Sequence, residues 1–214
     1  MPTRVKICGL TRLEDAERAV ALGTSALGFN FYPPSPRYIE PAAARAMVRR
    51  LPPFVTSVGV FANETDAGRV LSRARQGGVT ALQVHGPAYP ALEELICAFP
   101  LVVALAVREG FNAKDLERFK PSAYLLDAFD PERPGGTGRT VDWSAAREAT
   151  KWGPIILAGG LTPANVAQAI REVRPFAVDV ASGVESAPGI KDPEKLCAFF
   201  AAVAEADRDS LGVR

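Results

Sequence analysis

Three short stretches decide the fold: LVVALAV at 101–107, PIILAGG at 154–160 and FAVDVAS at 176–182. Each is almost continuously apolar, whereas a strand with one face in water alternates apolar and polar residues. Strands that are buried on both faces belong to parallel sheets covered by other elements on each side. The three stretches therefore predict a buried parallel sheet.

Apolar runs of this kind recur along the whole chain, about 25 residues apart, which suits one strand followed by one helix. They begin near Val5, Ala26, Ser57, Ala81, Val102, Tyr124, Ile155 and Ala177. Helix start signals lie between the runs, such as Thr11 with Glu14 in capping-box spacing and proline after Thr162. Eight such units predict an α/β fold, a compact (β/α)8 TIM barrel of eight parallel strands. An open doubly wound sheet is the alternative.

Length and composition restrict the class of protein. A chain of 214 residues predicts one domain, 1–214. The sum of 25 Lys and Arg against 24 Asp and Glu gives a net charge of +1, which argues against nucleic acid or a membrane surface as partner. The longest apolar runs fall far short of the about 20 residues of a bilayer span. Because the first residues also lack the apolar stretch of a signal peptide, we expect a cytoplasmic protein.

Cysteine and histidine usage argues against a metal site. Cys8, Cys97 and Cys197 are far apart, with no paired spacing, and His85 is the single histidine. We expect Cys97 and Cys197 to pack within helices. The chain has 4 Asn, 3 Gln and 18 Pro, which favours a thermophilic source, although a GC-rich genome explains its 19 Arg against 6 Lys equally well.

Glycine-rich turns follow the last two predicted strands. In a (β/α)8 barrel the active site lies at the C-terminal ends of the strands, and the loops after strands 7 and 8 commonly bind phosphate. Gly159-Gly160 and Ser182-Gly183 stand in these two loops. Glycine lets backbone N–H groups approach an anion. Ordinary tight turns are the alternative, but two such loops on neighbouring strands favour a phosphate site.

Three side chains at other strand ends complete a candidate site. Cys8 ends strand 1 and Asp127 ends strand 6, so in ring order they flank the phosphate loops, an arrangement that suits a general base and a general acid. Arg37, in the loop after strand 2, is placed to hold a carboxylate. The alternatives are a buried small hydrophobe for Cys8, a helix cap or loop salt bridge for Asp127, and a solvated loop charge for Arg37. His85 is expected to be a hydrogen-bonded residue of the rim.

Strand alternation adds a possible support for the base. Because Lys6 and Cys8 share one face of strand 1, a mouth-facing Cys8 places Lys6 inside the barrel just below it. Asp179 lies on the corresponding face of strand 8, which neighbours strand 1 in a closed barrel. We expect an internal Lys6–Asp179 ion pair whose cation favours the thiolate of Cys8, and support of the barrel alone is the alternative.

Eight motifs follow one another along nearly the whole chain. They are KICGLT at 6–11, GFNFYPPSPRYI at 28–39, VGVFAN at 58–63, LQVHG at 82–86, LLDAFD at 125–130, GGTGRTVDW at 135–143, LAGGLTPANV at 157–166 and VDVASGVESAPGIKD at 178–192. Together and in this order they resemble one family, phosphoribosylanthranilate isomerase of tryptophan biosynthesis. Departures are mild: Asn30 stands where an apolar residue is expected, and Ala181 where a small polar one is common.

The resemblance implies an Amadori rearrangement without cofactor or metal. N-(5-phosphoribosyl)anthranilate, a small phosphosugar, would become 1-(2-carboxyphenylamino)-1-deoxyribulose 5-phosphate. It implies Cys8 as general base, Asp127 as general acid, Arg37 as the carboxylate site, and the two loops as the phosphate site. Assembly as a homodimer stays open.

Two rival functions remain at this point. Another phosphosugar barrel enzyme would need either a Schiff-base lysine at the end of one of strands 2 to 8, or more histidine than this chain has. A non-catalytic phosphosugar-binding protein would need the glycine loops but not the pair of Cys8 and Asp127, so activity assays on variants of that pair separate it from an enzyme.

Overall fold

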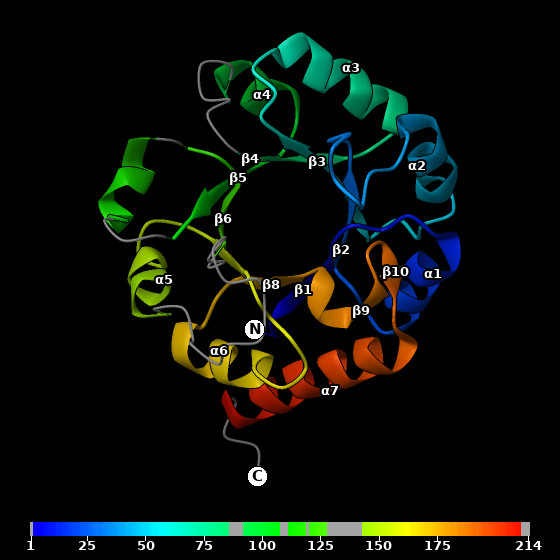
Figure 1. The fold of residues 1–214 in the computed structure, drawn as a ribbon. Helices are drawn as coiled ribbons and strands as arrows, with labels where there is room; N and C mark the ends of the chain where they lie inside the picture. The colour runs from blue at the N-terminus through cyan, green and yellow to red at the C-terminus, as the bar shows by residue number, and fades with distance from the viewer. Residues whose placement is uncertain (1, 86–91, 108–110, 119, 128–142, 211–214) are drawn as a thin grey trace.

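The strands close into a barrel. The structure is a computed structural model that describes residues 2–85, 92–107, 111–118, 120–127 and 143–210. Within these residues, strands β1 to β8 are parallel, follow one another in sequence order round the ring, and close with β8 beside β1. Figure 1 shows this ring surrounded by helices. The predicted (β/α)8 barrel is confirmed, and the open sheet is wrong.

Each strand begins within one residue of its predicted start. The strands are β1 (Arg4–Ile7), β2 (Ala26–Asn30), β3 (Thr56–Ala62), β4 (Ala81–His85), β5 (Leu101–Ala106), β6 (Ala123–Asp127), β7 (Ile155–Ala158) and β8 (Ala177–Val180). Continuous apolar runs locate them well because both faces of a barrel strand are buried.

Helices cover the outside of the ring. They are α1 (Leu13–Ala21), α2 (Pro41–Val48), α3 (Ala67–Gly77), α4 (Leu92–Ala98), the 3-10 helix η2 (Ala113–Arg118), α5 (Trp143–Ala149), α6 (Val166–Val173) and α7 (Pro193–Ser210). A short 3-10 helix η3 (Ser182–Val184) and the hairpin of β9 (Glu185–Ala187) and β10 (Ile190–Lys191) lie between β8 and α7. No helix in the described part of the chain is both long and apolar enough to cross a membrane.

Two predicted helix starts are wrong. Thr11 does not cap α1: the helix begins after Arg12 with no side-chain cap, and the Thr11 hydroxyl instead donates to the carbonyl of Gly189 at 2.6 Å. Helix α6 begins at Val166, after a turn in which Asn165 accepts from the N–H of Thr162, and not at the proline.

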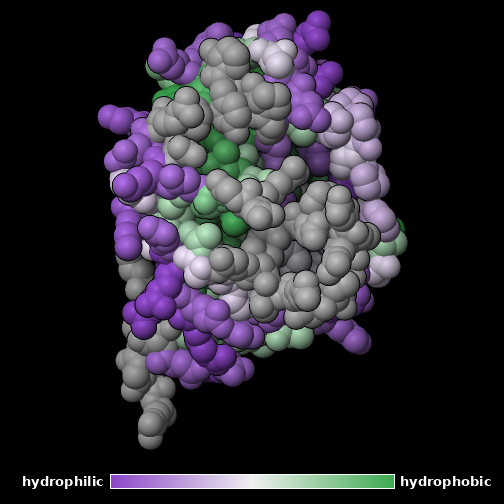
Figure 2. All heavy atoms as spheres, turned by 60° about the vertical axis from the view of Figure 1, so that its left-hand side comes forward, coloured by the Kyte–Doolittle hydropathy of each residue, from purple (hydrophilic) through white to green (hydrophobic). Residues whose placement is uncertain are grey.

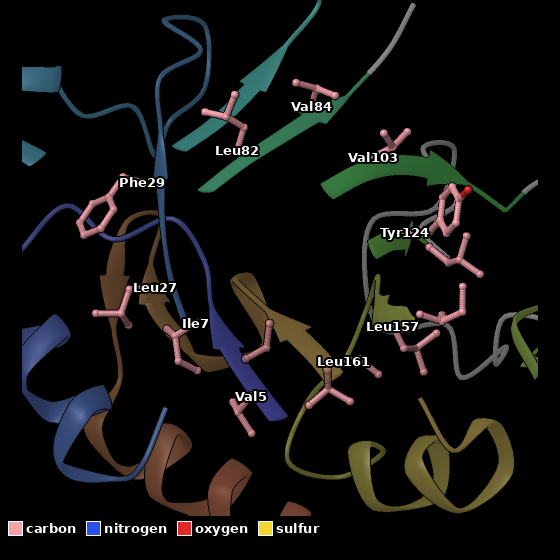
Figure 3. Close-up of a cluster of buried hydrophobic side chains, with 14 of the residues drawn as sticks. Val5, Ile7, Leu27, Phe29, Leu82, Val84, Val103, Tyr124, Leu157 and Leu161 are labelled. Atoms are coloured by element: carbon pink, nitrogen blue, oxygen red, sulfur yellow. The ribbon is translucent and has the colours of Figure 1, made fainter. Parts of the chain in front are cut away.

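Alternation along each strand separates two layers of core. Side chains such as Val103, Tyr124 and Leu157 lie in the large layer between strands and helices, part of which is drawn in Figure 3. Their neighbours point into the barrel, where a smaller cluster includes Leu125 and Ile156. The outer layer supplies most of the buried apolar area, which is the main stabilising contribution to a fold. The face of each strand that points into the barrel therefore carries fewer apolar side chains, and polar side chains occupy it near the mouth.

Solvent covers the outside of the helices. On the side shown in Figure 2, hydrophilic residues dominate the described surface, and hydrophobic ones occupy a smaller area between them. In α7 the buried positions Leu196, Phe199 and Val203 follow helical spacing. Cys197 is one position off this stripe and is exposed, as is Cys97 in α4, so the prediction that both pack in the protein is wrong.

Candidate active site

One cavity of about 230 Å³ opens at the C-terminal ends of the strands. Of the residues predicted for the site, those that line it are Cys8, Arg37, His85, Asp127, Gly159, Gly160, Asp179, Ser182 and Gly183. The structure therefore brings together side chains from six segments that are far apart in the sequence. Lys6 alone does not line the cavity; it is buried in the barrel below.

The ion pair expected from strand alternation is present beneath Cys8. Strand β1 pairs with β8 so that Lys6 lies opposite Asp179, and the Lys6 ammonium donates to a carboxylate oxygen of Asp179 at 2.9 Å. Both side chains are buried. Burial disfavours the charged ammonium, but Asp179 and Cys8 outweigh it and raise the pKa of Lys6 above its usual value. Lys6 is thus a cation within the barrel.

Burial also controls the thiol of Cys8. Desolvation raises its pKa, the ammonium of Lys6 lowers it, Asp179 raises it, and the ammonium of Lys191 lowers it. The net pKa lies above the ordinary value of a cysteine. Lys6 does favour the thiolate, as expected, but it only opposes the larger effect of burial. The resting thiol is protonated at neutral pH.

A glycine makes the space for this pair. A methyl group added at Gly28 would lie 2.8 Å from Cys8 Sγ, which is closer than real contacts come, and 3.2 Å from Lys6 Nζ, which is tighter than most. Gly28 stands in β2, beside β1. Sequence reasoning missed this residue because nothing in GFNF distinguishes a glycine that leaves room from a glycine that turns.

The two glycine loops meet each other at the cavity. Gly159 and Gly160 have positive φ angles of 85° and 63°, a conformation that favours glycine. In η3, a methyl group at Gly183 would lie 1.8 Å from the carbonyl oxygen of Leu161. The loop after β8 therefore packs directly on the loop after β7, and no larger residue than glycine fits there.

Arg37 is not a solvated charge. Its guanidinium donates from Nε to both carboxylate oxygens of Glu185, at 2.9 and 3.1 Å, and from Nη2 at 2.7 Å. The hydrogen bonds to Glu185 raise the pKa of Arg37. The stem of Arg37 lies over Gly9, where an added methyl group would come within 2.5 Å of its Cδ. Gly9 has a φ angle of 73° and brings this stem beside Cys8.

Glu185 and Lys191 complete a buried group of charges that the sequence did not reveal. Lys191 Nζ donates to Glu185 at 2.8 Å, and both side chains are buried. Burial opposes ionisation of Glu185, but the hydrogen bonds from Arg37 and Lys191 lower its pKa below the usual value. Arg37 and Glu185 are 148 positions apart, so no local pattern connects them.

His85 is a hydrogen-bonded residue of the mouth, as expected. Burial, with the Lys6 ammonium nearby, lowers its pKa to about 4, so the ring is neutral at physiological pH. The amide nitrogen of Gln83 lies 2.7 Å from His85 Nε2 and donates to it when the ring is neutral. Asn30, which departs from the family pattern, holds the loop after β2 by accepting from Tyr32 N–H and donating to Ser35.

Parts of two quoted motifs lie outside the described residues, namely 128–130 and 135–142, as does Gly86. Among the residues that the structure places, no group of three or more His, Cys, Asp and Glu is arranged to hold a metal ion.

Comparison with known proteins gives one consistent result. Residues 5–202 match the family model of N-(5′-phosphoribosyl)anthranilate isomerase. A relative of that name from Citrifermentans bemidjiense is 50% identical over 194 residues, which cover 91% of this chain and 93% of the relative. Another from Nitrosococcus oceani is 46% identical over 211 residues, with 95% and 98% covered.

Solved structures agree with the sequence relatives. The phosphoribosylanthranilate isomerase of Thermotoga maritima superimposes with a TM-score of 0.87 at 41% identity, covering 95% of this chain and 99% of that one. A phosphoribosylanthranilate isomerase in complex with reduced 1-(o-carboxyphenylamino)-1-deoxyribulose 5-phosphate gives 0.81 at 39% identity, with the same coverage.

The fold and its relatives define the class as a (β/α)8-barrel isomerase. Within that class the chain belongs to the N-(5′-phosphoribosyl)anthranilate isomerase family, and it catalyses that isomerisation in tryptophan biosynthesis.

Proposed function

We propose that Cys8 and Asp127 are the general base and general acid that convert N-(5′-phosphoribosyl)anthranilate to 1-(2-carboxyphenylamino)-1-deoxyribulose 5-phosphate. The observation that carries this assignment is their placement. They enter one cavity from β1 and β6, with the glycine loops of β7 and β8 between them in the ring. The related isomerase in complex with the reduced form of this product supports the same chemistry.

The reaction needs two proton transfers and no external oxidant or reductant. Protonated Asp127 donates to the furanose ring oxygen, the bond from that oxygen to C1′ breaks, and a Schiff base to the aryl nitrogen forms. The thiolate form of Cys8, which is the minor form in the resting site, removes the proton from C2′, and the electron pair moves to give an enolamine. Tautomerisation to the C2′ ketone completes the isomerisation. A positioned acid or base contributes about 10²- to 10⁴-fold each.

The two ends of the substrate, its phosphate and its carboxylate, indicate roles for the remaining residues. The backbone N–H groups of the loops at Gly159-Gly160 and Ser182-Gly183 bind the phosphate, and Arg37 binds the anthranilate carboxylate. Ala181 supplies no hydroxyl, so the loops act there through the backbone. In this scheme Lys6 and Asp179 support Cys8 from below, and His85 lines the mouth as a neutral ring.

Substitution of the pair tests the assignment. The assay is loss of the anthranilate-substrate fluorescence on addition of the protein. We expect Cys8→Ala and Asp127→Ala each to lower kcat by about 10²-fold or more, because each removes one proton-transfer group. Inorganic phosphate should still inhibit both variants with unchanged affinity. Turnover near that of the unaltered protein in either variant would overturn the assignment, and in both would favour a phosphosugar-binding protein.

The wider setting is part of the proposal. We infer one domain over 1–214, a cytoplasmic location, and a thermophilic source, the last supported by the few amide residues. We also infer a homodimer, because the Thermotoga maritima isomerase is described as dimeric and Phe54 here is 95% exposed between α2 and β3. Sedimentation and thermal unfolding measure the assembly and the stability directly; a monomer that unfolds near 50 °C, within the range of ordinary domains, would refute both inferences.

A further inference from the structure

The hairpin of β9 and β10 holds charges that the acid–base chemistry does not use. It follows the glycine loop of β8 and lies beside β1 and α1 (Figure 1). Glu185 begins the hairpin and Lys191 ends it, and both are buried. Charged side chains are rarely buried unless they are paired and hydrogen-bonded. Their contacts show what they hold.

Glu185 occupies one edge of Arg37. A guanidinium offers two edges for bidentate binding of a carboxylate, one through Nε and Nη2 and the other through Nη1 and Nη2. Glu185 takes the first edge. Within the described residues no hydrogen bond engages Nη1, and Arg37 lines the cavity. The end-on edge is therefore the one left for a second carboxylate.

Lys191 fixes the position of Glu185 relative to the ends of β1 and β8. Its side chain is 0% exposed, and its three N–H groups have three acceptors: Glu185, the carbonyl of Cys8 at 2.6 Å and the carbonyl of Ala181 at 3.2 Å. Those carbonyls end β1 and β8. The ammonium thus joins the backbone of the proposed base to the start of the proposed phosphate loop.

One carboxylate is shared here by two cations. Glu185 accepts from both Arg37 and Lys191, and the buried carboxylate of Asp15 accepts from the backbone N–H of Lys191. Because Glu185 is shared with Lys191, it orients Arg37 without fully neutralising it. A fully neutralised arginine would bind a substrate anion weakly, and an unpaired one would adopt many rotamers.

We propose that Glu185 and Lys191 are positioning residues for carboxylate recognition. Glu185 holds the Nε–Nη2 edge of Arg37 so that its end-on Nη1–Nη2 edge takes the aryl carboxylate of the substrate. Lys191 holds Glu185 against the ends of β1 and β8, at a fixed distance from Cys8 and the phosphate loop. This inference rests on the proposed role of Arg37 and adds the group that orients it.

The experiment compares two competitive inhibitors. One is the reduced product that carries the aryl carboxylate, and the other is the same phosphosugar amine built on aniline, without it. Their ratio of inhibition constants measures carboxylate recognition alone, because a general loss of structure weakens both. A charge-assisted bidentate pair is expected to give the unaltered protein about 10- to 100-fold preference for the carboxylated compound.

Glu185→Gln removes the anion and one strong acceptor. We expect this variant to lose about 10-fold of the preference, while inorganic phosphate inhibits it within about 2-fold of the unaltered protein. A retained preference, or equal weakening of both inhibitors, overturns the inference. Asp209→Asn, which breaks an exposed ion pair with Arg171 on the outer helices, is the matched control and should change neither value.

Arg37 variants separate this inference from the proposed function. Arg37→Ala should abolish the preference, and if it does not, the carboxylate role of Arg37 itself is wrong. Arg37→Lys decides even where Glu185→Gln fails to fold. A single ammonium paired with Glu185 has no second edge, so the preference should fall as far as in Arg37→Ala. If Arg37→Lys keeps the preference, the two-edge geometry is refuted.

Discussion

Lys6→Met should make the thiol of Cys8 ionise at higher pH. Lys6 is the cation that lowers the pKa of Cys8 most, against the larger effect of burial. Methionine keeps most of the volume of the lysine stem in a site that Gly28 leaves just wide enough. The substitution therefore removes the charge with little change in packing, and it leaves Asp179 as an anion that further disfavours the thiolate.

The size of the shift follows from the geometry. An opposite charge within hydrogen-bonding reach of a titrating group moves its pKa by about 1–3 units. We expect the midpoint of Cys8 ionisation to rise by about 1–3 units in Lys6→Met. The variant should also lose about 3–5 kcal/mol of unfolding free energy, because the buried carboxylate of Asp179 is left without its partner.

Alkylation by iodoacetamide against pH measures the midpoint. Cys97 and Cys197 are exposed and would react first, so the measurement uses a Cys97→Ser, Cys197→Ser background. Phosphosugar should protect the remaining thiol. The double variant Lys6→Met, Asp179→Asn carries neither charge, and its midpoint should fall between those of the background protein and Lys6→Met.

The order of the three midpoints is the decisive result. If Lys6→Met and the background protein are alkylated with the same pH profile, the pair only supports the barrel. If the double variant lies above Lys6→Met, Asp179 does not oppose the thiolate and the electrostatic reasoning is wrong.

Three more predictions come from the same geometry. Because the pKa of His85 is lowered to about 4 in the fold, unfolded chains take up the proton first as pH falls. Denaturant unfolding should show about 3 kcal/mol lost between pH 6.5 and 4, and less in His85→Gln. Gly183→Ala drives a methyl group against the Leu161 carbonyl, so it should raise the inhibition constant of phosphate about 10-fold or more. Gly160→Ala meets open space but has a positive φ, so it should cost only about 1–2 kcal/mol of unfolding free energy. Gly28→Ala should lower kcat more than it changes KM, since its methyl group meets Cys8 and Lys6; an unchanged kcat in a folded variant would show that the thiol has room to move.

Four of the residues that sequence reasoning located share one property: strand alternation and ring order place Lys6, Cys8, Asp127 and Asp179. Lys6 and Asp179 are 173 positions apart, yet both lie on strands, and closure of the ring makes those strands neighbours. Strand alternation and closure of the ring are therefore sufficient to predict this contact. Cys8 and Asp127 follow from the same rules.

Glu185 and Lys191 escaped prediction because they lie outside the ring. The hairpin that carries them is set by contacts with Arg37, Cys8 and Ala181, and no periodicity reports such contacts. The capping prediction at Thr11 failed for a similar reason, since the hydroxyl is oriented by a tertiary partner, the Gly189 carbonyl, to which it donates. Local patterns predict elements, and long-range polar partners then adjust their ends.

The N-terminal residues contact both β8 and α7. Lys6 in β1 pairs with Asp179 in β8, and Thr3 donates twice to Asp207 in α7, 204 positions away. Closing so long a loop costs chain entropy before any contact forms, and contacts of this separation slow folding. Cys8, the proposed base, precedes most of the barrel in the sequence but gains its environment only after β8 and the hairpin of β9 and β10 have been synthesised. The reactivity of the Cys8 thiol therefore indicates when the ring closes. A truncated chain that ends before β8 cannot show the thiol reactivity of the closed barrel.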